Sequence, residues 1–274
     1  MKLFTTLAML LLYTTTLLAQ DLRTKLETAY TLFGAAVKAK DQAKLKASMS
    51  SYSYLTAKNE IISAQVKFPD GFFSSAPRMI FDLKKQTFIK AVENGPTANS
   101  IYRGKDAFGS ESLIIIHFLK EDNTWKFSGV QSKSSSDLIN KLKANDTTFF
   151  KDKDFYPNGM LPVAPKEIVS IDYKGMLDVM GPGYDVQIKL NDIVQPGPNG
   201  DGFNADQGSL NILVLGGVKK GLNKIDITIT PIPGKQQKTL MMNVAVVIGE
   251  NELEVFSLEE AKPAATISKE FTVK

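Results

Sequence analysis

The sequence predicts an α+β protein of two domains, with N-terminal helices packed on a curved antiparallel sheet and then an antiparallel β-sandwich. Hydrophobic residues recur at helical spacing near the start of the chain and alternate at strand spacing further on. A stretch rich in Gly and Pro at 151–165 separates the two parts. Across it the charge changes sign: residues 20–157 carry 21 Lys and Arg against 15 Asp and Glu, and residues 158–274 carry 11 against 14. We therefore expect domains at 20–150 and 166–274, joined by a linker at 151–165.

Residues 1–19 have the pattern of a secretory signal peptide. Lys2 supplies one positive charge, an apolar segment runs from Leu3 to Leu18, and the small residue Ala19 precedes the expected cleavage site. The alternative is an uncleaved membrane anchor, because the two kinds of segment look alike. The chain has no cysteine, so neither a disulfide nor a lipid-modified cysteine can form. We expect a secreted or periplasmic protein that does not associate with the membrane after cleavage.

The elements of the first domain follow one another along the chain. Apolar residues at spacings of three and four predict a helix over 22–40, and Asp41 is placed to cap a second helix. The segment 61–77 mixes Gly, Pro and Phe and is expected to be irregular. β-branched and aromatic runs then predict strands at 79–83, 87–91 and 100–103 and a hairpin over 113–131, followed by a short helix at 138–143.

The hairpin contains the sequence F-L-K-E-D-N-T-W-K-F at residues 118–127. Together with the order of the elements, this segment resembles the NTF2-like (cystatin-like) superfamily, in which a long last hairpin carries a Trp after its turn. The resemblance covers about residues 21–132, and it places Trp125 in the core. Members of this superfamily include small-molecule isomerases and dehydratases as well as binding domains without chemistry, so the fold does not choose between them.

The second domain has no stretch with helical spacing. Short runs rich in Val, Ile and Leu alternate with turn residues, and they predict strands at 167–173, 176–180, 184–190, 209–215, 224–230, 239–248, 252–258 and 266–273. This number of short strands in about 110 residues indicates an antiparallel sandwich. It resembles the immunoglobulin-like or jelly-roll accessory domains of exported proteins.

His117 is the only histidine of the chain, so a site that needs several histidines is excluded. Strand alternation places it on one sheet face with Leu113 and Ile115. In the resembling superfamily one sheet face lines a cavity, which makes His117 a candidate general base with Asp82 or Tyr102 beside it. The competing interpretation is a histidine at a sheet margin or in a satisfied core position. It is favoured because no obvious partner stands near His117 in the sequence.

Four aromatic residues are candidates for ligand binding. Phe72 and Phe73 are adjacent in an irregular segment and could line the mouth of a pocket. Tyr184 and Phe203 could form stacking platforms for a sugar. Packing in a core is the commoner fate of such residues.

The loop 195–206 is rich in oxygen-bearing side chains, and four of them have the chemistry of calcium ligands: Asn199, Asp201, Asn204 and Asp206. If Asp201 and Gly202 stand at the fifth and sixth positions of an EF-hand loop, Gly197 is first and Gly208 last, where carboxylates belong. A solvated turn is therefore favoured, with calcium as the alternative and no other cofactor expected.

The chain lacks the short signatures of common enzymes, such as a nucleophile elbow, a phosphate-binding glycine loop or a zinc-protease helix. The leading interpretation is an exported, non-enzymatic binding or accessory protein, whose ligand is a small apolar molecule or a carbohydrate. One alternative is an NTF2-like isomerase, dehydratase or hydrolase that uses His117. Another is a cell-envelope module that binds a protein partner. Nucleic acid is not expected, because no dense basic cluster is present and the protein is exported.

Overall fold

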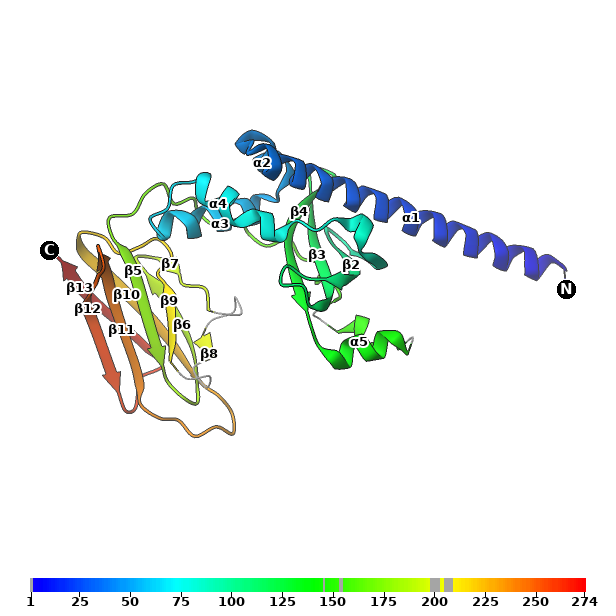
Figure 1. Cartoon of the computed structure of the whole chain (residues 1–274). Coiled ribbons are helices and arrows are strands. Elements are labelled where there is room, and N and C mark those ends of the chain that lie inside the picture. The colour runs from blue at the N-terminus through cyan, green and yellow to red at the C-terminus, as the bar shows by residue number, and fades with distance from the viewer. Residues whose placement is uncertain (1, 145, 153–154, 198–202, 205–208) are drawn as a thin grey trace. The chain divides into compact units, whose positions relative to one another are not determined.

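The computed structural model describes residues 2–144, 146–152, 155–197, 203–204 and 209–274. The protein is α+β with antiparallel sheets (Figure 1). It divides into two compact units: the first holds residues 1–56 and 72–165, and the second holds residues 57–71 and 166–274. The expected domains are 20–150 and 166–274, with a linker at 151–165. Residues 57–71, however, group with the second unit, and the expected linker at 151–165 groups with the first.

The helical elements precede the first sheet, as expected, except for two short ones that follow it. They are α1 (Lys2–Ala39), α2 (Gln42–Ser48), α3 (Ser51–Ser63), α4 (Asp70–Ser75), the 3-10 turns η1 (Ala76–Met79) and η2 (Leu83–Lys85), and, beyond the sheet, α5 (Ser136–Lys143) and η3 (Thr148–Lys151). The helix expected over 22–40 and the cap at Asp41 are confirmed, since Asp41 Oδ1 accepts a hydrogen bond from Lys44 N at 3.0 Å. In the part of the chain that the structure describes, no helix has the length and apolar character to cross a membrane.

Two expectations for residues 61–83 are wrong. The segment 61–77 is not irregular throughout, because α3 continues to Ser63 and α4 begins at Asp70. The strand expected at 79–83 is replaced by parts of η1 and η2. Pro77 stands in the first turn of η1, and Asp82 Oδ1 accepts a hydrogen bond from Lys84 N at 3.2 Å at the start of η2. These local signals outweigh the apolar run between them.

The first sheet is a meander in the order β1 (Thr87–Asn94), β2 (Thr97–Lys105), β3 (Glu111–Glu121) and β4 (Thr124–Lys133). The hairpin expected over 113–131 is confirmed. Asp122 and Asn123, between its strands, both have left-handed backbones, with φ of 49° and 59°. Farther along, β4 carries one extra residue: Phe118 pairs with Phe127 and His117 with Gly129, which leaves Ser128 as a bulge.

Different elements pack on the two faces of this sheet. On one face α1 supplies Phe33, whose ring stacks on that of Phe127 at 3.8 Å between centroids. On the other face Ile101 and Ile115 form a buried cluster with residues that follow the sheet: Ile139 of α5, and Phe149, Phe150 and Phe155. Alternation along β3 places His117 on this second face, away from α1. Trp125 on β4 is buried, with 8% of its surface exposed.

The second unit is built from strands. They are β5 (Lys174–Met180), β6 (Tyr184–Leu190), β7 (Ile193–Val194), β8 (Phe203–Asn204), β9 (Leu210–Leu213), β10 (Gly221–Pro231), β11 (Leu240–Ile248), β12 (Asn251–Glu260) and β13 (Thr266–Val273). One sheet has the order β13-β10-β6-β7 with β8 also on β6, and the other has the order β12-β11-β5-β9. Both sheets contribute to one buried cluster, for example through Ile227 and Val244. The strand expected at 167–173 is wrong, because only Tyr173 forms a bridge there, to Val218.

Polar side chains explain why residues 57–71 belong to the second unit. Asn59 is buried; its Nδ2 donates to the carbonyl of Lys166 at 2.9 Å and its Oδ1 accepts from Ile168 N at 2.8 Å. Ser63 Oγ accepts from Gly216 N at 2.8 Å. Side chains at the end of α3 therefore satisfy backbone groups of Lys166, Ile168 and Gly216, which lie outside the strands.

Candidate functional site

A cleft of about 480 Å³ lies over the sheet face that carries His117. Its lining comes from Thr97 and Asn99 on β2, from residues 117–119 on β3, and from residues 156–158 and 160–162. We call residues 155–162, which are hydrogen-bonded to the end of β1 and to β2, the strap. The strap falls within the expected linker, and it is part of the first unit.

Side chains of the sheet hold the backbone of the strap in place. Asn99 Nδ2 donates to the carbonyl of Phe155 at 2.9 Å, and Asn94 Nδ2 donates to the carbonyl of Pro157 at 2.9 Å. The third bond runs the other way, from Gly159 N to Thr97 Oγ1 at 3.0 Å. These three bonds make the strap a fixed wall of the cleft rather than a tether between domains.

Gly159 is required where it stands. Its φ is +79°, a backbone angle that residues other than glycine rarely adopt. An added Cβ would also lie 2.8 Å from Asn94 Nδ2. The amide of Asn94 is the same group that binds the strap at Pro157. The absence of a side chain at this position therefore lets the strap approach the β1–β2 turn closely.

His117 and Asn99 stand opposite each other on neighbouring strands. The distance between His117 Nδ1 and Asn99 Oδ1 is 2.9 Å. Because Asn99 Nδ2 already donates to Phe155, the Oδ1 atom is the acceptor in this pair, and His117 Nδ1 carries the hydrogen. Nε2 is then the bare nitrogen of a neutral ring, and it has no hydrogen-bond partner among the residues that the structure describes.

The surroundings of His117 favour the neutral ring. Burial, and after it the positive charge of Lys133, lower the pKa of His117 from 6.5 to about 4. At neutral pH the imidazole is therefore uncharged, and Nε2 carries a lone pair on a residue that lines the cleft. A ring in this state accepts a hydrogen bond well but takes up a proton poorly.

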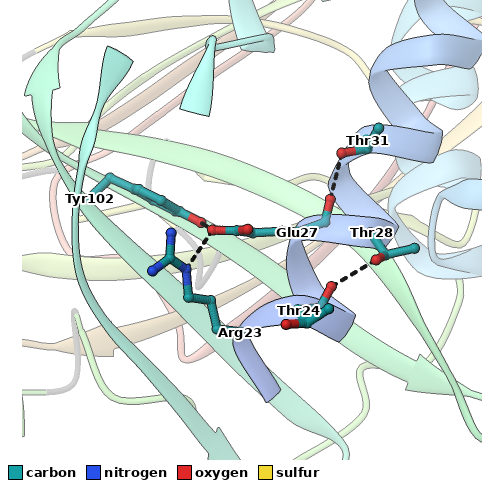
Figure 2. A network of polar contacts seen from close by, with 6 residues as sticks. All are labelled: Arg23, Thr24, Glu27, Thr28, Thr31 and Tyr102. Carbon is teal, nitrogen blue, oxygen red and sulfur yellow. Dashed lines mark hydrogen bonds and ion pairs between the residues drawn. The ribbon is translucent and has the colours of Figure 1, made fainter. Parts of the chain in front are cut away.

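The structure does not bring Tyr102 to His117. Tyr102 Oη donates to Glu27 Oε1 at 3.0 Å, which also accepts from Arg23 Nε at 2.7 Å, on the side of the sheet that α1 covers (Figure 2). The Arg23 guanidinium lies 4.1 Å from the centre of the Phe88 ring. Burial, with the negative charge of Glu27, raises the pKa of Tyr102 far above its usual value, so the phenol keeps its proton in this network.

The Asp82 side chain likewise interacts with residues other than His117. Its carboxylate caps η2 and pairs with Lys85 Nζ at 3.6 Å. The partner that His117 does have, Asn99, was missed in the sequence. The register of β2 against β3 would have found it, because that register places the two residues opposite each other.

The four aromatic candidates are buried in the two cores. Phe72 and Phe73 are 3% and 6% exposed, and the Phe72 ring meets that of Phe33 edge-on at 6.5 Å between centroids. Tyr184 and Phe203 belong to the buried cluster of the second unit. Each of these rings is therefore packed in the core of the unit to which it belongs.

The candidate calcium loop falls mostly outside the described residues. Asn199, Asp201 and Asp206 are not described, and the backbone of Asn204 pairs with that of Asp185 on β6. Within the described ranges, no group of three or more His, Cys, Asp or Glu side chains is arranged to hold a metal ion.

Comparison with known proteins gives no family for this chain. No protein-family model matches it, and neither the curated proteins nor the solved structures yielded a match. The cleft beneath the strap is therefore the feature on which a functional argument rests.

Proposed function

We propose that this chain is an exported binding or accessory protein, and that its first unit holds a small ligand in the cleft beneath the strap. The NTF2-like arrangement of the first unit and the sandwich arrangement of the second are part of the proposal. The first is supported by the helices that precede a four-stranded meander, and the second by the single core to which both sheets of that unit contribute.

The observation that carries the proposal is the fixed, uncharged ring of His117 in the lining of the cleft. Asn99 holds the ring by Nδ1, and Asn99 is itself 4% exposed and bound to the strap. A preformed polar group within a largely apolar concave surface is typical of small-molecule sites. Here the apolar part comes from side chains such as Leu119, Met160 and Leu161.

A catalytic role is the second candidate, because an orienting amide behind a histidine is also an arrangement that enzymes use. Two facts favour binding over catalysis. A base with a pKa near 4 removes protons weakly at neutral pH. Among the described lining residues there is also no carboxylate, lysine or arginine that could stabilise a developing charge, and the Thr97 hydroxyl is engaged with Asn94 and Gly159.

Binding can be tested by NMR on the full chain with a set of small uncharged fragments. We expect saturable shifts of Thr97, His117 and Met160 signals at millimolar fragment, with the signals of the second unit unmoved. As a matched control, Gly129→Ala should leave these shifts unchanged, because Gly129 lies beside His117 but an added Cβ meets nothing within 4 Å. Fragments that bind only elsewhere would contradict the proposal. Turnover of a carbonyl, ester or hydroxy-acid substrate that disappears in His117→Gln would support the enzyme instead.

Export and the role of the second unit are further parts of the proposal. The charge and apolar pattern of residues 1–19 support a cleaved signal peptide. We expect the mature protein to begin at Gln20 and to be recovered outside the cytoplasm, which N-terminal sequencing checks. Recovery of the chain with Met1 intact in the membrane fraction would instead support the uncleaved anchor. The second unit is proposed to dock the protein on a carbohydrate or a protein partner.

A further inference from the structure

We infer that the ligand of the cleft is an uncharged molecule with an apolar body, and that it donates a hydroxyl or N–H hydrogen to Nε2 of His117. This inference rests on the proposed function and adds the chemical class of the ligand. Three features of the cleft support it: the direction of the hydrogen bond at Asn99, the absence of a donor for Nε2 among the residues that the structure describes, and the chemistry of the remaining lining.

The direction of the hydrogen bond at Asn99 decides which nitrogen faces the ligand as an acceptor. The two polar atoms of the Asn99 side-chain amide have different partners: Nδ2 donates to the carbonyl of Phe155 and Oδ1 accepts from His117 Nδ1, both at 2.9 Å. Turning the amide over would place its Oδ1 against the Phe155 carbonyl, oxygen against oxygen. The ring hydrogen is therefore held on Nδ1, and Nε2 presents a lone pair.

The lone pair of Nε2 has no hydrogen-bond partner within the described part of the chain. No donor among the described residues reaches it, although Thr97, Asn94 and Asn99 all form hydrogen bonds nearby. A ligand that brings a donor satisfies this nitrogen. A ligand that brings only an acceptor, such as an ether oxygen, sets one lone pair against another and leaves Nε2 without a partner once water is displaced.

The rest of the lining selects against charge. Met160 and Leu161 are 67% and 48% exposed, so the strap presents apolar surface to an incoming molecule. No lysine or arginine is among the described lining residues, so an anion would lose water there without a positively charged lining partner, and a carboxylate would bring no hydrogen for Nε2. A cation would be opposed by Lys133, whose positive charge already disfavours a proton on His117. An uncharged donor avoids both costs.

The test uses phenol and anisole, two probes of similar shape of which only phenol has a hydrogen to donate, and benzoate as the charged probe. The full chain is labelled with ¹⁵N-histidine and ¹³C-methyl methionine. Because the chain has one histidine, its two ring nitrogens give an unambiguous report. We expect phenol to shift the Nε2 signal saturably, and to bind about threefold to tenfold more tightly than anisole, as one hydrogen bond allows. Benzoate should bind more weakly than phenol.

Variants separate the hydrogen bond from the shape of the cleft. In His117→Phe, which keeps an aromatic ring and removes the acceptor, the affinity for phenol should fall to that for anisole, measured at the Met160 methyl signal. Gly129→Ala should preserve the difference between the two probes. Equal binding of phenol and anisole with an unmoved Nε2 signal, or tightest binding of benzoate, overturns the inference and leaves the cleft as a binding site. Absence of all three probes from the cleft overturns the inference together with the proposed function.

Discussion

Acid should weaken the first unit through His117 before the carboxylates respond. In the unfolded chain His117 titrates near 6.5, and in the folded protein its pKa is about 4, lowered by burial and then by Lys133. Between these two values the unfolded chain binds the proton and the folded protein does not. The stabilisation is therefore fully present above pH 6.5, is lost as the pH falls from 6.5 to 4, and is constant below that.

The size of the effect follows from the two pKa values. One pKa unit corresponds to about 1.4 kcal/mol, so the drop from 6.5 to about 4 corresponds to about 3 kcal/mol in the free energy of unfolding. About 2 kcal/mol of this should already be lost at pH 5. A loss of this size is a substantial fraction of the stability of an ordinary domain.

Urea unfolding of the wild type and of His117→Gln across this pH range measures the effect. Trp125 is the only tryptophan and lies in the first unit, so its fluorescence reports that unit alone. Carboxylates such as Glu111, whose pKa is held below its usual 4.5 by the hydrogen bond from Arg103, titrate in both proteins and cancel in the difference. We expect the difference in unfolding free energy between the two proteins to change by about 3 kcal/mol between pH 7.5 and pH 4. Parallel pH profiles would refute the reasoning, because they would mean that His117 takes up its proton as easily when folded.

Three further changes test the architecture around the site. Trp125→Ala should lower the unfolding free energy of the first unit by about 3–5 kcal/mol, as a large-to-small core change does. A circular dichroism melt with an unchanged midpoint would mean that Trp125 does not stabilise the core of the first unit. Asn59→Ala should cost the second unit about 1–3 kcal/mol, because it leaves buried backbone groups at Lys166 and Ile168 unpaired; equal urea midpoints, followed on amide signals of that unit, would argue against this. Gly159→Ala should cost about 1–3 kcal/mol in urea unfolding and shift the signals of the strap, because the added Cβ meets Asn94; unchanged strap signals would show that the close approach is not needed.

The regular elements could be predicted because their signals are local. The apolar spacing along residues 22–39 defines the face of α1 that covers the sheet, and the polar turn before Trp125 defines the β3–β4 hairpin. Asp122 and Asn123 are residue types that tolerate a left-handed backbone, and both adopt one. The run 79–83 shows the limit of such patterns, because a proline and a capping aspartate turned an apolar strand pattern into 3-10 turns.

Of the candidate site, the sequence indicates only His117, because the contacts of the site join residues that are distant in sequence through single side chains. His117 and Asn99 meet only because of the register of two strands, and neither residue carries a pattern that gives that register. The strap has the Gly and Pro content of a linker, yet side chains of Asn94, Thr97 and Asn99 bind its backbone. Asn59 likewise ties its segment to the second unit through hydrogen bonds that leave no periodic signal in the sequence.

The most direct test of the account is the ¹⁵N NMR spectrum of the His117 ring at neutral pH in the protein without ligand. The bond to Asn99 predicts one neutral tautomer, with the hydrogen on Nδ1 and a bare Nε2, which persists until the pH falls below about 5. In Asn99→Ala the preference for this tautomer should be lost. A hydrogen on Nε2, or a ring that titrates near its ordinary value of 6.5, would contradict the account, because the cleft would then present a donor instead of a lone pair.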